Sequence, residues 1–243
     1  VINSIQDQFN KNEATYLSSS LYHRKSALDF ALLHNFPGRK DEEYKYTPID
    51  RILKKNFGFE KIITSKTTAL HFEDHFYKLK GNHLVFLNGN YLPARSELLN
   101  DVCCQSATDS DQSFKDVFDA LNVAFCEDTL KIEVSENYRP QPFFIYYFFD
   151  SEQGQVFGNP NIQITAHSNT HIQILEKTIS TGIHPVFINK KVSVDVKANA
   201  EVNITKIQNY KKHVFQVYNL EVNQDTQSKF NSNVYSFAGG LIR

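Results

Sequence analysis

Cysteines and histidines are the residues whose types and spacing could hold a metal ion or an iron–sulfur cluster. A cluster usually needs about four thiolate ligands, and the sequence has three cysteines. Cys103 and Cys104 are adjacent, so in a strand they would point to opposite sides. Cys126 is distant and ends an apolar helical stripe. We therefore predict burial for Cys126 and no cluster held by these cysteines.

Two histidines four residues apart are the second candidate for metal chemistry. His71 and His75 enclose Glu73 and Asp74, and on a helix this spacing places both imidazoles on one face, where they could ligate zinc. The metalloprotease pattern needs a glutamate directly after the first histidine, but Phe72 stands there. We therefore interpret the segment as a solvated, charged helix.

The remaining polar groups give no further catalytic pattern. His167 and His171 are also four residues apart, but a turn separates them, so we expect them to point outward from neighbouring strands. Arg39 and Lys40 precede three acidic residues, which favours a solvated turn over a phosphate site. The sequence lacks a glycine-rich phosphate loop and a Gly-x-Ser-x-Gly motif. We predict no catalytic, cofactor-binding or metal-ligating residues.

The first part of the chain is typical of helices with a few strands. Leu21, Leu28 and Leu32 recur at helical spacing after three serines that can cap the helix. The segment Phe36-Pro37-Gly38 should end that helix. The other expected elements are a helix from Thr47 to about Gly58, a hairpin around Asn88-Gly89, a helix over residues 114–125 and a strand over residues 130–134.

An internal repeat begins after about residue 136, where helical periodicity gives way to short alternating strands. Residues 161–174 align with residues 191–204, and Asn169 coincides with Asn199. A third copy follows and repeats the apolar positions at Leu220, Val222 and Phe230. Each copy is too short to bury its own apolar face, whereas stacked copies share one continuous core.

The repeat therefore predicts a β-solenoid, and the alternative is an antiparallel sandwich whose strands resemble one another by chance. The last apolar strand, which begins at Leu241, lacks a polar cap. An uncapped coil would expose open strand edges. We therefore expect the native protein to continue beyond Arg243.

The composition is typical of a folded, globular protein, with 41% hydrophobic and 22% charged residues. A net charge of −1 gives no general attraction to nucleic acid or to an anionic membrane. The longest apolar run, residues 142–149, is too short to span a bilayer. The chain opens without a secretion leader, and its cysteines form no disulfide framework. We expect a cytoplasmic protein without nucleic acid or membrane partners.

Four segments, in order along the chain, resemble the SufD family of the SUF iron–sulfur cluster assembly system. Residues 36–47, Phe-Pro-Gly-Arg-Lys-Asp-Glu-Glu-Tyr-Lys-Tyr-Thr, are similar to a segment near the family's start, with Tyr44 in place of its usual tryptophan. Residues 84–93 resemble the family's hairpin, and residues 118–134 its Leu-Asn-x-Ala region with the strand that follows. Residues 236–243 resemble the segment that leads into its central coils.

The resemblance implies a mainly β fold: a right-handed parallel β-helix preceded by a helical or mixed α+β N-terminal domain. On this interpretation residues 1–135 form the N-terminal domain and residues 136–243 form the first part of the β-helix. The chain would be truncated before the family's C-terminal helices, which dock the ATPase SufC. The residues usually proposed for cluster chemistry would also lie beyond Arg243.

The resemblance also implies a non-catalytic scaffold, not an enzyme, that pairs with SufB and binds SufC. In isolation the protein could form a homodimer. The resemblance assigns no bound cofactor to these residues, and iron or an iron–sulfur cluster would be held transiently in the complex. The paralogue SufB shares the repeat core, but the segment at residues 36–47 favours SufD.

A carbohydrate-active enzyme is the alternative function, because right-handed β-helices also host polysaccharide lyases and hydrolases. Such a site needs paired acids from adjacent coils. When the copies of the repeat are aligned, Asp195 meets Thr165, and Glu201 meets His171, so these acids do not stack into a row. The repeat region contains few acids: Glu176, Asp195, Glu201, Glu221 and Asp225.

Overall fold

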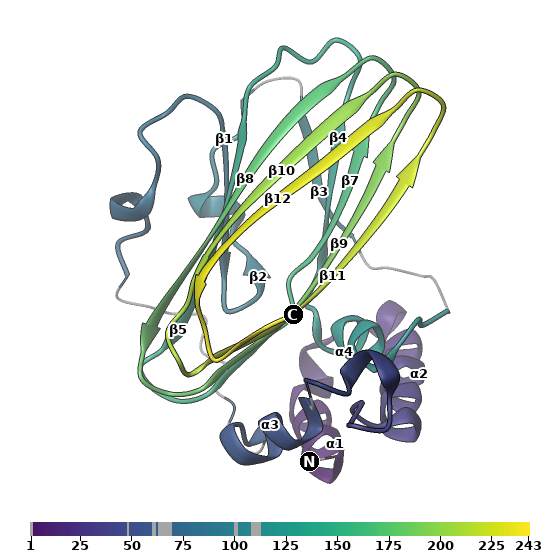
Figure 1. Ribbon diagram of the computed structural model, residues 1–243, viewed down its shortest axis with the longest axis vertical. Coiled ribbons are helices and arrows are strands. Elements are labelled where there is room, and N and C mark those ends of the chain that lie inside the picture. Colours follow the sequence, from purple (N-terminus) through teal and green to yellow (C-terminus); the bar gives the residue numbers. More distant parts are fainter. Residues whose placement is uncertain (1, 48, 60–61, 63–69, 100–101, 108–112) are drawn as a thin grey trace.

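The computed structural model describes residues 2–47, 49–59, 62, 70–99, 102–107 and 113–243. Its long strands form an elongated column, and the α-helices gather beside one end of that column (Figure 1). Within these ranges no helix combines the length and the apolar character that crossing a membrane requires.

The column consists of two sheets, and from β7 onward successive strands of the chain belong alternately to one sheet and the other. The first sheet runs in the order β12-β10-β8-β5-β1-β2 and the second in the order β13-β11-β9-β7-β4-β3, with β6 paired to β9. The strands of the first sheet are β1 (Asn82–Leu87), β2 (Asn90–Tyr91), β5 (Phe143–Ser151), β8 (His171–Gly182), β10 (Glu201–Asn209) and β12 (Lys229–Ala238). Those of the second are β3 (Val102–Ala107), β4 (Thr129–Val134), β6 (Val156–Gly158), β7 (Asn161–Ala166), β9 (Val186–Val196), β11 (Val214–Gln224) and β13 (Leu241–Ile242).

The register between coils reproduces the sequence repeat. Ile162 of β7 lies opposite Val192 of β9, and Val192 lies opposite Leu220 of β11, which is the alignment of the three copies. In the other sheet, Val202 of β10 lies between Ile172 of β8 and Phe230 of β12 in the same way. Because these pairings are all parallel, the predicted parallel β-helix is confirmed and an antiparallel sandwich is excluded.

The turn between the two sheets is built the same way in successive coils. Asn169 and Asn199 adopt positive φ angles of 62° and 59°, and Gln227 takes the same place with 57°. Asparagine tolerates this left-handed conformation better than most residues. The side chain of Asn199 donates to Oδ1 of Asn169 across 3.4 Å, so the coincidence of these asparagines in the repeat marks a stacked corner.

Apolar side chains fill the column, and β5 is buried on both of its faces. Phe143, Ile145, Tyr147 and Phe149 belong to the cluster inside the column, whereas the alternate residues pack outside it against residues 70–77. A strand covered on both faces has a nearly continuous apolar sequence. This explains the long apolar run at residues 142–149.

The helices pack together against the outer face of β9 and β11. On the helix predicted after Thr47, Ile49 and Leu53 are fully buried and Ile52 is partly buried. The predicted serine cap of the second helix is wrong, because Leu17 occupies the cap position and the Ser20 hydroxyl donates to the Leu17 carbonyl. The α-helices are α1 (Ile2–Asn12), α2 (Ser18–His34), α3 (Ile49–Asn56) and α4 (Val117–Phe125), and the 3₁₀ helices are η1 (Glu13–Thr15), η2 (Glu42–Tyr44), η4 (Phe72–His75) and η5 (Pro93–Arg95).

Strands that precede residue 136 already belong to the two sheets. β1 pairs in parallel with β5, and β4 pairs in parallel with β7. The predicted hairpin at Asn88-Gly89 is present, with φ angles of 51° and 97° at these residues. The division of the chain between residues 135 and 136 stays a prediction.

Candidate functional site

A buried ion pair lies inside the column. The ammonium of Lys190, on β9, is 2.7 Å from Oε2 of Glu176, on β8, and their side chains are only 5% and 4% exposed. The hydroxyl of Tyr147, on β5, donates to Oε1 of the same carboxylate across 3.2 Å. Both oxygens of a buried carboxylate are therefore engaged, as a low-dielectric interior requires.

A second cation adjoins this ion pair. Lys206, on β10, places its ammonium 3.5 Å from the ring centroid of Tyr218. Lys190 lies 4.0 Å from the ring centroid of Tyr147 and 4.7 Å from that of Tyr218. The aromatic faces thus partly replace the water that two buried ammonium groups have lost. We call Tyr147, Glu176, Lys190, Lys206 and Tyr218 the interior cluster.

Burial determines the protonation of the interior cluster. Desolvation lowers the pKa of Lys190, although the neighbouring Glu176 opposes this shift, and it lowers the pKa of Lys206 to about 8. Desolvation raises the phenol pKa of both Tyr147 and Tyr218 well above its usual value. The tyrosines are therefore neutral at physiological pH, and Lys206 loses its charge at a lower pH than an exposed lysine does.

We predict that the stability of the protein rises between about pH 8 and pH 9.5 because of Lys206. Its pKa falls from 10.5 to about 8 on folding, so in this interval the unfolded chain binds a proton that the folded chain has released. The free energy of unfolding should increase by at most about 1.4 kcal/mol per pH unit. Urea unfolding at several pH values checks this: Lys206→Met should flatten the rise, and the exposed Lys212→Met should not. An unchanged slope in Lys206→Met would refute the assignment.

The histidine segment and Cys126 lie in different parts of the structure. The expected charged helix is present only as the short 3₁₀ helix η4, Phe72–His75, in which Glu73 and Asp74 are exposed but Phe72 is buried against Phe148. No group of three or more His, Cys, Asp or Glu side chains that could hold a metal ion occurs within the described ranges. Cys126 is buried, as predicted.

The acids of the coils occupy the predicted register. Thr165 lies opposite Asp195, and His171 lies opposite Glu201. Glu176, in contrast, lies inside the column, where it forms an ion pair with Lys190. These acids therefore do not combine into the paired carboxylates of a glycosidase.

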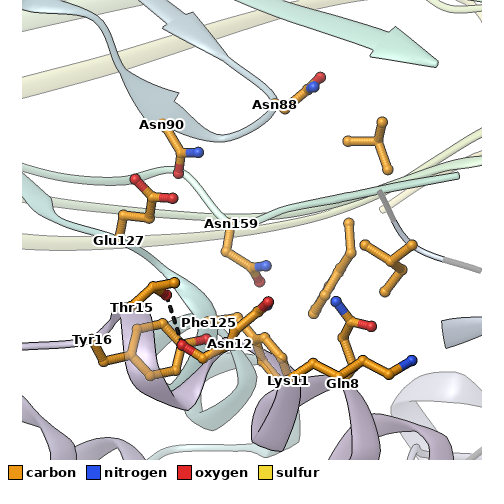
Figure 2. A pocket seen from close by; sticks show the side chains of 13 residues that line it. Gln8, Lys11, Asn12, Thr15, Tyr16, Asn88, Asn90, Phe125, Glu127 and Asn159 are labelled. Atoms are coloured by element: carbon orange, nitrogen blue, oxygen red, sulfur yellow. Dashed lines mark hydrogen bonds between the residues drawn. The ribbon is translucent and has the colours of Figure 1, made fainter. Parts of the chain in front are cut away.

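A pocket of about 280 Å³ lies where α1 meets the end of the column (Figure 2). One face of α1 and the turn after it form one wall, the hairpin between β1 and β2 forms another, and the end of α4 with β6 closes it. Its lining is rich in carboxamides, which come from Gln8, Asn12, Asn88, Asn90 and Asn159. We call it the amide pocket.

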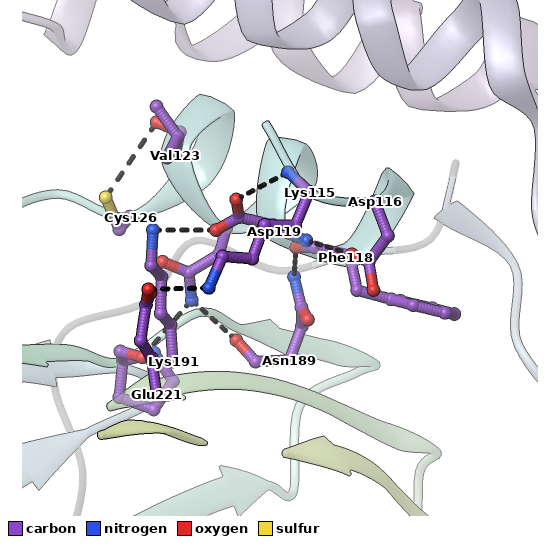
Figure 3. Close-up of polar contacts among 11 residues, drawn as sticks. Lys115, Asp116, Phe118, Asp119, Val123, Cys126, Asn189, Lys191 and Glu221 are labelled. Atoms are coloured by element: carbon purple, nitrogen blue, oxygen red, sulfur yellow. Dashed lines mark hydrogen bonds and ion pairs between the residues drawn. The ribbon is translucent and has the colours of Figure 1, made fainter. Parts of the chain in front are cut away.

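Polar contacts join α4 to the column (Figure 3). The side-chain amide of Asn122 donates to the carbonyls of Pro160 and Asn189 across 3.2 and 2.7 Å. The side-chain amide of Asn189 in turn donates to the Phe118 carbonyl across 2.9 Å. Lys191 lies 2.7 Å from the carboxylate of Asp119. Asn122 belongs to the segment that resembles the family's Leu-Asn-x-Ala region, and here it connects helix and solenoid.

A column of parallel coils with a helical unit docked on its side defines a β-solenoid protein. Residues 148–243, which form most of these coils, match the family described as SUF system FeS cluster assembly, SufBD core domain. The chain is also 24% identical over 224 residues to the iron-sulfur cluster assembly protein SufD of Escherichia coli (strain K12), across 85% of this chain and 50% of that protein. Both matches support a SufB/SufD family member that is SufD-like. It spans about half the length of this curated relative.

Proposed function

We propose that this protein is a non-catalytic scaffold of the SUF system, which pairs with SufB and binds the ATPase SufC in the cytoplasm. Iron or an iron–sulfur cluster is then cargo of the complex and not a resident cofactor of these residues. The observation that carries the proposal is the match of residues 148–243 to the SufBD core domain, because these residues form the stacked coils from β5 to β13.

The structure of the coils suits such a role. Parallel stacking holds the two sheets in fixed register over several coils, and broad sheet faces can pair with a similar β-helix. The interior is occupied by apolar side chains and by the interior cluster. Partner contacts would therefore use the outer faces and edges of the column.

Co-expression of the complete protein with SufB and SufC of the same organism tests the proposal. We expect a tag on SufC to retain both other proteins through size-exclusion chromatography, in one complex of fixed stoichiometry. Elution of this protein alone, with SufB and SufC present and folded, would contradict the proposal. Turnover of a pectin-like polymer by the purified protein, with or without calcium, would instead favour the carbohydrate-active alternative.

A further inference from the structure

Gln8 is a buried amide that has no hydrogen-bond partner among the described residues. Its side chain lies on the face of α1 that lines the amide pocket, and the residue is only 3% exposed. Figure 2 shows its amide directed into the pocket, toward the same space as the amides of Asn12 and Asn159. A buried polar group normally has a partner, so the pocket presents an unused donor and acceptor.

The chemistry of the pocket lining is that of neutral amides. Each carboxamide offers an N–H donor and a carbonyl acceptor in one plane, as a peptide group does. The lining charges are one cation, Lys11, and one anion, Glu127, which balance. Phe125, Val156 and Phe157 supply apolar surface beside the amides. A neutral ligand with peptide groups and an apolar side chain matches this combination.

The aromatic rings disfavour a sugar as the ligand, because a sugar ring needs a free aromatic face on which to stack. The Tyr16 ring is covered by the guanidinium of Arg24, at 4.5 Å, and by the ring of Phe9, at 5.3 Å. Phe157 stacks on Phe187 with ring centroids 5.2 Å apart and meets the ring of Phe125 at 5.3 Å. These faces are occupied by protein.

We propose that the amide pocket binds the main chain of a short, extended peptide segment of a partner protein, about two residues long, with one apolar side chain. Gln8 and Asn159 hydrogen-bond the peptide groups, and Phe125, Val156 and Phe157 receive the side chain. Asn159 is itself held in place, since its Oδ1 accepts from the amide of Asn189 across 3.1 Å. Its N–H groups remain for the ligand.

Nuclear magnetic resonance titration with N-acetyl-L-leucine N-methylamide tests this proposal. The probe carries two peptide groups and one apolar side chain. We expect saturable shifts of the side-chain NH₂ resonances of Gln8 and Asn159. Gln8→Leu should weaken binding about tenfold or more, because it removes hydrogen bonds to the probe whose net contribution to the binding free energy corresponds to about that change in affinity.

Gln6→Leu is the matched control, because Gln6 lies on the same helix but is exposed. It should leave the affinity unchanged. Gln8→Leu should melt no lower than the wild type, since it removes a buried amide without a partner, so lost binding cannot be assigned to unfolding. The proposal is overturned if the two amide resonances do not move, if both variants lose affinity equally, or if maltose shifts these resonances and the peptide probe does not.

Discussion

Replacing Lys190 by methionine is expected to lower the free energy of unfolding by about 3–5 kcal/mol. The substitution keeps the volume of the side chain but leaves the Glu176 carboxylate buried without its cation. Glu176 is 4% exposed and 2.7 Å from the Lys190 ammonium, so water cannot replace the lost partner. Its other contact, the Tyr147 hydroxyl, is neutral and cannot compensate for a full charge.

Chemical denaturation followed by circular dichroism measures this effect. Lys212→Met, at an exposed position, is the control for loss of a lysine and should change stability by less than about 0.5 kcal/mol. The double variant Glu176→Leu with Lys190→Met should recover part of the stability, because it removes both members of the ion pair and leaves Lys206 as the one charge of the interior cluster, with the Tyr218 ring still facing it. A double variant that is no more stable than Lys190→Met would contradict this account of the pair.

Replacing Arg24 by methionine should destabilise the protein by about 3 kcal/mol. The guanidinium of Arg24, on α2, donates to the carbonyls of Val123 and Ala124 across 3.2 Å and to that of Glu127 across 2.8 Å, and it also reaches the Cys126 carbonyl. These carbonyls belong to the last turn of α4 and to the two residues after it, where a cation also favours the helix dipole.

The same denaturation experiment with circular dichroism applies to Arg24. The exposed Arg51→Met is the matched control, and Arg24→Lys should lie between it and Arg24→Met, because an ammonium keeps the charge but cannot reach as many carbonyls. If Arg24→Met is as stable as Arg51→Met, the guanidinium is not what holds the end of α4.

The stacked coils could be predicted from the sequence because their register depends on repeated local features. Asn169 and Asn199 mark the same corner in two coils, and their left-handed backbone conformation favours asparagine. The inward apolar positions alternate regularly on either side of these corners. The same sequence offset therefore aligns β7 with β9 and β8 with β10, which are the two pairs of strands in successive coils. Such features need no knowledge of distant contacts.

The interior cluster was missed although alternation points to it. Glu176 follows Ile172 and Ile174 at every second position of β8, which is an inward place. Lys206 follows Val202 and Ile204 in the same way. Inward positions of a β-solenoid are usually apolar, so a charged residue at such a position does not by itself indicate burial. Only the three-dimensional structure brings Lys190 of another strand to the Glu176 carboxylate and stabilises it inside.

The sequence gives no signal for the role of Arg24 or for the short length of the histidine helix, for similar reasons. Arg24 shares a helix face with Leu21 and Leu28, three and four residues away, but its partners are the carbonyls of a helix much further along the chain. The helix expected at His71 to His75 is a single 3₁₀ turn, and its Phe72 packs against Phe148 of a distant strand. Tertiary contacts of this kind leave no local periodicity in the sequence.

Disulfide formation between coils measures the predicted stacking most directly. With the native cysteines replaced by alanine, Thr165→Cys and Asp195→Cys should form a disulfide readily, since the two residues lie opposite each other in neighbouring parallel strands, about 4.8 Å apart. Thr165→Cys with Ser193→Cys, displaced by two residues, should remain reduced, because the diagonal separation of about 8 Å exceeds what a disulfide can bridge. Formation of the second disulfide in preference to the first would contradict the parallel column on which the proposed scaffold depends.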